Sequence, residues 1–363
     1  MLPRVFADAP ELRALHDLDE AWADRRPGAR TTALRRAGAS LGESFAAGPR
    51  VVAARTFDVA RWAQRTKLAL AGAPRRAGRF VALTHRTLLV QFLQRGSLKT
   101  LLFDPTDPHA ARATPCFEES SSSLPLRLTA RVLAPLEAGL AALGLGVDDV
   151  DYVAFDTLHA QDLRTLLGAA DGSTLSRFRR AKLLVPRAEW DALDAPHALQ
   201  RRWLVPGARA GVETRNVVLT DGDLSLGDGV MLLRTPGHTP GTQTLFVNTG
   251  AGVFGFSANG VSADSWSPLA SRIPGVLGYA RRGAHEVLPH ASTPDRLGDQ
   301  IDSMLLERAV ASRVRQAPAF AQVVPSSELT PSLLSPRLRA TWQFDGLTTG
   351  VVARPSRAER RAG

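Results

Sequence analysis

The sequence predicts a mixed α/β protein, in which short apolar strands alternate with amphipathic helices along most of the 363 residues. Three observations support this fold class. Several apolar runs end abruptly in a polar residue, as Val150–Phe155 does before Asp156. Asp-Gly turns separate short strands between residues 215 and 233, which is typical of hairpins. Residues 296–316 have a strong helical periodicity.

The composition is that of a globular protein. Hydrophobic residues make up 44% and charged residues 22% of the chain, and the length favours two domains over one. Lys and Arg number 45 against 35 Asp and Glu, which gives a net charge of +10. The arginines are spread from Arg4 to Arg361 without interleaved aromatic residues, so we expect no nucleic-acid partner.

A single cysteine, Cys116, cannot form an intrachain disulfide, and it also excludes a cysteine-rich metal site. A reducing compartment is therefore the default expectation. The first residues contain no signal-peptide core, and no apolar run reaches the length of a bilayer. From the sequence we expect a cytoplasmic protein without a membrane partner.

The first part of the chain is predicted to be mostly helical. Apolar positions recur at helical spacing in residues 11–22 and 59–72, with Pro-Gly breaks between them. We therefore expect an N-terminal helical extension over residues 1–78, followed by the main domain over residues 79–350. The residues from 351 to 363 are basic and are expected to form a flexible tail.

Two strands with a turn at Gly96 follow, and the second strand runs directly into Asp104. Sites are often assembled at strand ends, but an Asx turn with Pro105 explains this carboxylate equally well. The polar stretch Ser120–Ser123 is predicted to be a surface loop that borders a pocket.

The most distinctive stretch is Val230–Asn248, in which two apolar strands flank the turn around His238. Pro236 and Pro240 restrict φ, whereas the neighbouring glycines permit conformations closed to other residues. Such a turn holds one imidazole in a fixed direction, as a metal ligand or a general base requires. The alternative is an ordinary histidine in a surface turn between hairpin strands.

A second chemical focus is the segment 156–162, which follows a short buried strand. Thr157, His159 and Gln161 would share one side of an extended backbone, and Asp162 begins the next helix. An imidazole and a carboxylate at this separation can close on one cation. Alternatively, Asp162 is a first-turn residue that complements the helix dipole.

The order of these strands and polar tips resembles the metallo-β-lactamase superfamily over roughly residues 80–329. The segment around His238 matches the family's Pro-Gly-His-Thr-Pro-Gly stretch, and residues 150–163 match its Thr-His-x-His-x-Asp-His signature by position. Asp104, Asn259 and Ser327 fall at its other polar strand ends. The resemblance implies a four-layer αββα sandwich of the metallo-β-lactamase type.

The match also departs from the family pattern at ligand positions. Thr157, Gln161, Asn259 and Ser327 stand where the family has metal ligands, and Asp162 stands in place of a histidine. A two-metal site needs a bridging carboxylate, so we expect none here. The resemblance instead implies one divalent ion, expected to be zinc, bound by His159, Asp162 and His238.

Asp162 is then also the candidate catalytic residue, while Asp104 and Thr157 are candidates to orient the ligands. The implied function is a metal-dependent hydrolase with a reduced site, acting on a small-molecule ester, amide or lactone. The alternative is an inactive homologue that serves as a binding scaffold for a small molecule or a protein. A homodimer is a further expectation, because the N-terminal segment was placed outside the sandwich.

Overall fold

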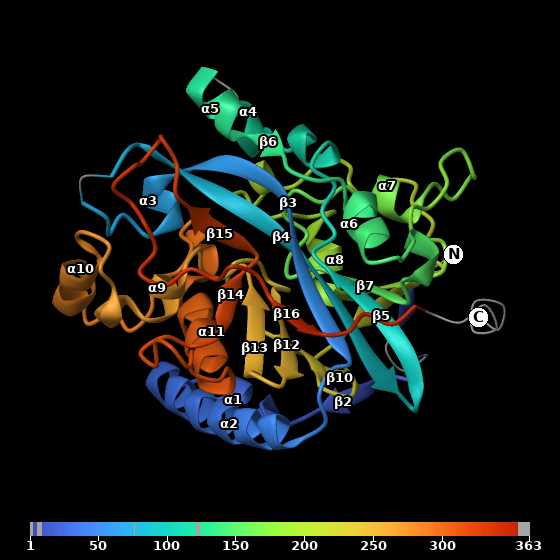
Figure 1. The fold of residues 1–363 in the computed structure, drawn as a ribbon, viewed down its shortest axis with the longest axis horizontal. Helices are drawn as coiled ribbons and strands as arrows, with labels where there is room; N and C mark the ends of the chain where they lie inside the picture. Colours follow the sequence, from blue (N-terminus) through green and yellow to red (C-terminus); the bar gives the residue numbers. More distant parts are fainter. Residues whose placement is uncertain (1–2, 6–8, 76, 121–123, 355–363) are drawn as a thin grey trace.

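Two β-sheets pack face to face and carry helices on their outer faces, which confirms the predicted four-layer αββα sandwich (Figure 1). The computed structural model describes residues 3–5, 9–75, 77–120 and 124–354. Most of the predicted serine loop, residues 121–123, and the predicted tail from residue 355 onward lie outside the described residues.

The first sheet is mixed. Its order is β1-β9-β8-β7-β5-β4-β3-β16, with β15 added to β4 and β6 to β3. The strands from β5 to β1 run parallel, whereas β3, β4, β15 and β16 pair in antiparallel fashion. The described strands are β1 (Arg4–Val5), β3 (Ala53–Arg65), β4 (Phe80–Gln94), β5 (Ser97–Phe103), β6 (Arg131–Val132), β7 (Tyr152–Ala154), β8 (Lys182–Pro186), β9 (Val217–Thr220), β15 (Ser327–Thr330) and β16 (Thr348–Gly350).

The second sheet contains the predicted hairpins. Its order is β14-β13-β12-β11-β10-β2, and its pairs are antiparallel except for β13 with β14. These strands are β2 (Arg13–Leu15), β10 (Asp223–Gly227), β11 (Val230–Arg234), β12 (Gln243–Thr249), β13 (Gly252–Ser257) and β14 (Val323–Pro325).

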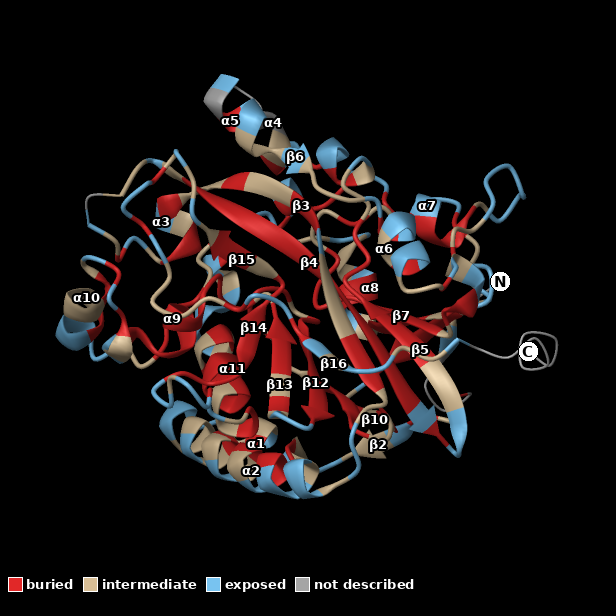
Figure 2. Ribbon diagram, in the orientation of Figure 1, coloured by how far each residue is buried: buried red, intermediate tan, exposed pale blue. Residues whose placement is uncertain are grey.

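The apolar residues form separate cores between the layers, so the buried residues follow the layers of the fold (Figure 2). Phe92 and Phe103 from the first sheet meet Leu232 and Val247 from the second in the central core. Two further cores lie beneath the outer helices. The helices over the first sheet are α6 (Leu136–Ala142), α7 (Leu163–Leu167) and α8 (Arg187–Ala192), and those over the second are α1 (Asp19–Ala23), α2 (Pro27–Ala47), α9 (Ala263–Trp266) and α11 (Leu297–Val310).

Four further helices of the described residues lie around the edges of the sandwich. Three of them, α3 (Thr66–Ala69), α4 (Pro115–Ser120) and α5 (Leu124–Thr129), flank the end of the β3–β4 hairpin that lies near the top of Figure 1. The fourth is α10 (Val276–Gly283). Among the described residues, no helix is both long enough and apolar enough to cross a membrane.

The predicted N-terminal helical extension is wrong in two respects. Its one long helix among the described residues is α2, since α1 and α3 have five and four residues, and residues 59–65 form part of the strand β3. The predicted boundary at residue 79 lies between β3 and β4, which pair along almost their whole length. Pairing with β4 therefore overrides the helical spacing of the alanines in β3. β1 and β3 belong to the first sheet and β2 to the second, so this segment is part of the sandwich.

Two buried acidic groups support the sheets. On β15, Glu328 is fully buried and pairs with the guanidinium of Arg86 on β4, which also donates to Asp58. Burial raises the pKa of Glu328 to about 7. On β10, Asp223 accepts a 2.7 Å hydrogen bond from the backbone N–H of Arg234, and burial raises its pKa to about 6.

Candidate functional site

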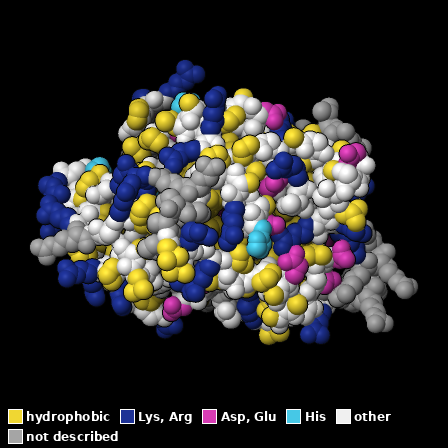
Figure 3. Space-filling view, turned by 90° about the horizontal axis from the view of Figure 1, so that it is seen from above, with side chains coloured by type: hydrophobic (Ala, Val, Ile, Leu, Met, Phe, Trp, Pro, Cys, Tyr) yellow, Lys and Arg dark blue, Asp and Glu magenta, His cyan; other side chains and the backbone are white. Residues whose placement is uncertain are grey.

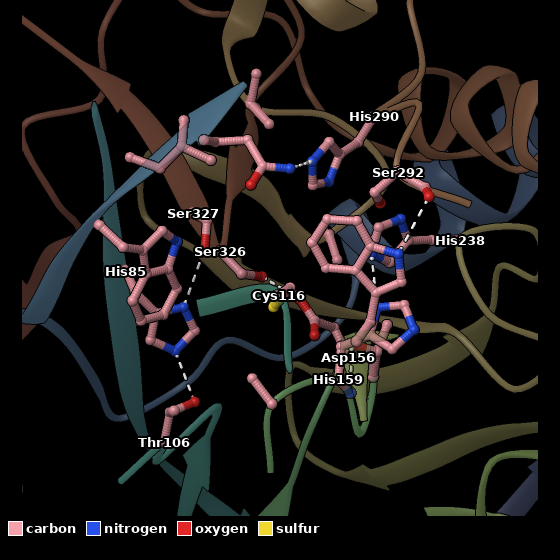
Figure 4. Close-up of a pocket in the computed structure, with 18 of the residues that line it drawn as sticks. His85, Thr106, Cys116, Asp156, His159, His238, His290, Ser292, Ser326 and Ser327 are labelled. Carbon is pink, nitrogen blue, oxygen red and sulfur yellow. Dashed lines mark hydrogen bonds between the residues drawn. The ribbon is translucent and has the colours of Figure 1, made fainter. Parts of the chain in front are cut away.

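A pocket lies where strand ends and loops of both sheets meet, and its walls carry most of the polar strand tips singled out in the sequence (Figure 4). Its cavity measures about 110 Å³. Four imidazoles line it together with a carboxyl group, three serine side chains and aromatic rings. The lining includes Trp62, His85, Phe117, Asp156, His159, Trp203, His238, His290, Ser326 and Ser327.

Hydrogen bonds and a close backbone approach hold the turn around His238. Thr239 accepts a 2.9 Å hydrogen bond from the N–H of Gly237, and its hydroxyl donates to the buried carboxylate of Glu189. Gly237 has a φ of +137°, and an added Cβ would lie 2.2 Å from the backbone nitrogen of Gln300. Only glycine fits this approach. His238 is buried, which rules out the alternative of a histidine in an exposed surface turn.

His159 and His238 come together, as expected. The Nδ1 atom of His159 lies 3.2 Å from the Nε2 atom of His238, and the two rings meet edge to face. His159 follows β7 in the first sheet, and His238 follows β11 in the second. The pair therefore joins the ends of both sheets.

The side chain of Gln200 fixes the orientation of His159. Its amide nitrogen donates to the carboxylate of Asp295 and to the carbonyl of His238, so its amide oxygen faces the Nε2 atom of His159 at 2.7 Å. The Nε2 atom must therefore carry the proton of a neutral His159. Its Nδ1 lone pair then points toward His238.

The third imidazole, His290, stacks on His238 with ring centroids 5.0 Å apart. Its Nε2 atom lies 3.2 Å from the amide nitrogen of Gln64, which donates to it. The Nδ1 atom of His238 has no hydrogen-bond partner among the described residues. The stack therefore places one unsatisfied ring nitrogen in a buried position, where a missing partner costs stability.

All four imidazoles of the pocket are neutral at pH 7. Burial lowers the pKa of His85, His159 and His290 to about 4, and it lowers the pKa of His238 well below its usual value. A neutral imidazole has a free lone pair, which is the form that binds a metal or accepts a proton.

Asp162 does not join the two histidines, which corrects the predicted ligand set. Its side chain caps the N-terminus of α7 by accepting a 3.0 Å hydrogen bond from the N–H of Arg164, and it forms an ion pair with the same guanidinium. It faces a different, smaller cavity from the one that His159 and His238 line. The helix-terminus alternative describes this residue better than a metal or catalytic role.

Gln161 and Asn259 stand at positions where the family has metal ligands. Their side chains also form hydrogen bonds within the protein. The amide of Gln161 donates a 2.7 Å hydrogen bond to the hydroxyl of Thr106. The amide of Asn259 donates a 2.7 Å bond to Glu307, which is fully buried and also accepts from Thr244, Ser257 and Trp266. Asn259 is thus part of a buried network beside the pocket and not a ligand bridging two metals.

Ser327, at the position of the family's last histidine, contacts an imidazole that the sequence did not single out. Its hydroxyl lies 3.1 Å from the Nδ1 atom of His85, whose Nε2 atom lies 2.8 Å from the hydroxyl of Thr106. Trp62 stacks on the other side of His85 at 5.1 Å. These residues form a wall opposite the His159–His238 pair.

A pair of buried carboxyl groups lies beneath the pocket. Asp104 accepts a 2.9 Å hydrogen bond from the backbone N–H of Asp156, and Asp156 accepts from the hydroxyl of Ser326. Burial raises the pKa of both groups, that of Asp156 to about 6, and the charge of Asp156 further raises that of Asp104. Asp104 therefore supports the turn that leads to Thr157 and does not itself line the pocket.

We tested whether these residues fit the metal that the resemblance implies. Two ligands of one tetrahedral zinc at ~2.0–2.1 Å lie about 3.3 Å apart, close to the observed separation of 3.2 Å. The bond from His159 to Gln200 is the outer contact that a metal-bound histidine needs. No three His, Cys, Asp or Glu side chains of the described residues converge on one ion, however. The spacing of the two imidazole nitrogens is therefore compatible with one shared cation as well as with a hydrogen bond between the rings, and the described residues offer no three-ligand or two-metal centre.

Sequence reasoning missed His85, Gln200 and His290. His85 lies within a predicted strand, where a polar residue among apolar ones was the available signal. Gln200 and His290 come from irregular segments without a motif, and only the folded chain brings His290 to the pocket and Gln200 to the ring of His159.

No family model matches the chain. Two curated relatives, N-acyl homoserine lactonases from Bacillus sp and Bacillus thuringiensis, are each 29% identical to it over 110 residues. This region is 30% of the chain, and it spans only 38% of the length of the relatives.

Solved structures with a similar fold include three hydrolases. An N-acyl homoserine lactone lactonase is 17% identical, with 65% of this chain and 88% of that one covered and a TM-score of 0.43. The dizinc lactonase AidC is 12% identical, with 76% and 87% covered and a TM-score of 0.48. The hydrolase AbOPH of the β-lactamase superfamily is 13% identical, with 85% and 99% covered and a TM-score of 0.44.

Proposed function

We propose that this protein hydrolyses an ester-type or lactone-type bond of a small molecule in the histidine pocket. The observation that carries the proposal is the His159–His238 pair, whose ring nitrogens lie 3.2 Å apart with one ring held by Gln200. The partial sequence similarity to N-acyl homoserine lactonases supports a lactone as the first substrate class to test.

The proposal retains one divalent ion, with zinc as the first choice, and assigns its protein ligands to His159 and His238 alone. A bound zinc supplies a Lewis acid for the substrate carbonyl and a water molecule with a pKa near ~7. Two protein ligands are fewer than the three of a usual catalytic zinc site, so weak binding is expected. Asp162 has no part in this proposal, because Arg164 holds its carboxylate.

The surrounding residues contribute orientation and exclusion of water. Gln200 and Asp295 hold the ring of His159, and His290 supports His238 by stacking. Trp62 and Phe117 pack edge to face at 5.3 Å on the opposite wall. A substrate carbonyl placed between these walls would lie in a water-poor environment, where polar contacts are stronger.

The test is hydrolysis by the full chain of a panel of N-acyl homoserine lactones, simple lactones and aryl esters, with and without added zinc. We expect zinc-stimulated turnover of at least one class, lost on His238→Ala and retained on Asp162→Asn. Equal turnover by wild type and His238→Ala would refute the site. Binding of a panel compound without any turnover would favour the alternative of an inactive binding scaffold.

A further inference from the structure

A second cavity of about 470 Å³ lies next to the histidine pocket, in a size range typical of small-molecule sites. Both cavities are lined by Trp62 and Phe117, so these two rings form the partition between them. The second cavity is lined by residues of β3 and β6 and by Pro108, Ala111, Arg112, Phe117, Arg127 and Ala130. The two cavities are thus neighbours, with these two rings between them.

The cavity is strongly basic. Four arginines line it, and none of the lining residues that the structure describes is acidic. Figure 3 views the molecule from the side where α4, α5 and β6 lie, and on that face Lys and Arg side chains are more widespread than Asp and Glu side chains. The four residues are Arg61, Arg112, Arg127 and Arg131.

Two of these arginines stand directly opposite each other. Arg61 on β3 is the cross-strand partner of Arg131 on β6, and paired residues of an antiparallel ladder point to the same side of the sheet. Like charges in this position repel each other. Burial and the charge of Arg131 both lower the pKa of Arg61. Thr84 accepts a 3.2 Å hydrogen bond from Arg61 but does not neutralise it.

No carboxylate of the described residues forms an ion pair with any of the four guanidinium groups. The nearest acid along β3, Asp58, contributes some favourable charge to Arg61 but is bound to Arg86. Asp107, which precedes the lining residue Pro108, faces Arg177 at 4.0 Å. The basic charge of the cavity is therefore not balanced by its lining.

We infer that this cavity binds the anionic group, a carboxylate or a phosphate, of a small-molecule ligand whose neutral part reaches the histidine pocket across Trp62. Guanidinium groups bind such anions through paired, charge-assisted hydrogen bonds. An anion between Arg61 and Arg131 would also relieve their repulsion. The inference rests on the proposed function for the identity of the ligand, but anion binding does not require hydrolysis.

The first experiment measures the binding of inorganic phosphate and of acetate by calorimetry, at constant chloride, and the melting temperature with and without phosphate. The variants are Arg131→Gln and Arg112→Gln. Arg281→Gln is the matched control, because it removes the same charge from an exposed position on α10.

We expect wild type and Arg281→Gln to bind one of the two anions equally well. Arg131→Gln and Arg112→Gln should each bind that anion about tenfold more weakly, because one charge-assisted hydrogen bond is lost. Without anion, Arg131→Gln should melt at or above the wild-type temperature, because a repulsive pair is gone. Absence of binding to wild type, or equal weakening in Arg281→Gln, would overturn the inference.

The second experiment compares a carboxylate-bearing ester with its neutral amide-capped analogue in the hydrolysis assay. Arg131→Gln is expected to raise KM for the charged ester alone and to leave kcat unchanged. An equal rise in KM for both esters would contradict the placement of the anion. If neither ester is hydrolysed, the proposed function fails while the binding experiment still decides the anion site.

Discussion

The Nδ1 atom of His159 lies 3.2 Å from the Nε2 atom of His238, although 79 residues separate the two positions in the chain. One ring follows a strand of the first sheet and the other a strand of the second. Their relative position therefore depends on how the two sheets pack, and any shift between the sheets would separate the two nitrogens.

The ligand assignment predicts how metal affinity changes on substitution. His159→Ala and His238→Ala should each lower zinc affinity at least about tenfold, because one of two donors is lost. Asp162→Asn should leave affinity unchanged, since Arg164 already holds that side chain. Competition titration against a chromophoric chelator measures the zinc affinity of each of the three variants. A loss in Asp162→Asn equal to that in His238→Ala would restore the three-ligand prediction.

Gln200 is predicted to be a positioning residue. Gln200→Ala removes the acceptor of the Nε2 proton of His159, so the ring is free to turn and to exchange tautomers. We expect zinc affinity to fall about tenfold. The conservative variant Gln200→Asn keeps the amide but places it on a shorter side chain. Its zinc affinity should therefore recover less than half of the loss, measured as the logarithm of the dissociation constant. Unchanged zinc affinity in Gln200→Ala, in a variant that unfolds like wild type, would show that the ring needs no such support.

The turn before His238 should not tolerate a side chain at position 237. Gly237→Ala combines an unfavourable φ with a clash against Gln300, so we expect a loss of about 2–5 kcal/mol in the free energy of unfolding. Gly298→Ala is the control, because it lies in α11 with no atom near the added Cβ. It should be neutral or stabilising by up to about 1 kcal/mol in denaturant titrations. A similar stability of both variants would argue against the close approach of Gln300.

Because Arg86 and Glu328 form a buried ion pair, substitutions at the two positions should have non-additive effects on the free energy of unfolding. Arg86→Met should destabilise the protein by about 3–5 kcal/mol, because it leaves the carboxyl group buried without its cation. The double variant Arg86→Met/Glu328→Leu should recover a large part of that loss. Chemical denaturation of the two single variants and the double variant gives the coupling free energy. Additive losses would mean that the two groups do not depend on each other.

The raised pKa of Asp223 predicts that the stability of the protein depends on pH. Its pKa rises from 3.8 to about 6 on folding, chiefly through burial, so the folded state holds its proton more tightly than the unfolded state. This contribution to stability is complete below pH 3.8 and is lost as the pH rises through 6. Asp223→Asn keeps the neutral form at every pH and retains the oxygen that accepts from Arg234.

The free energy of unfolding of Asp223→Asn, relative to wild type, should therefore increase between pH 4 and pH 7 by up to about 3 kcal/mol. Urea titrations at pH 4, 5, 6 and 7 measure this difference. Asp221→Asn, an exposed acid near the same strand, is the control. A difference that does not change with pH would contradict the raised pKa.

Much of the fold could be predicted because its signals are local. A strand that ends in Asp104, and a strand that ends in the turn of His238, are visible in a few consecutive residues. The segment 59–65 was predicted wrongly for the opposite reason. Its alanines and arginines suit a helix, and only the distant partner β4 makes it a strand.

The candidate site was predictable only in part. His159 and His238 follow strands whose ends meet, so their convergence could be expected from the order of the strands. The direction of Asp162 depends on the first turn of α7 and on Arg164, which spacing alone does not specify. His290 reaches the pocket, and Gln200 reaches the ring of His159, from irregular segments for which the sequence offers no periodicity.

The contact between Asn259 and Glu307 limits which side chains position 259 can carry. Replacing the amide by aspartate would set one carboxylate against another in a fully buried position. Such a substitution would therefore require a change of the glutamate as well, and with it of the hydroxyl and indole groups that it binds. An acidic ligand at this strand end is thus disfavoured by a neighbour that does not itself line the cavity.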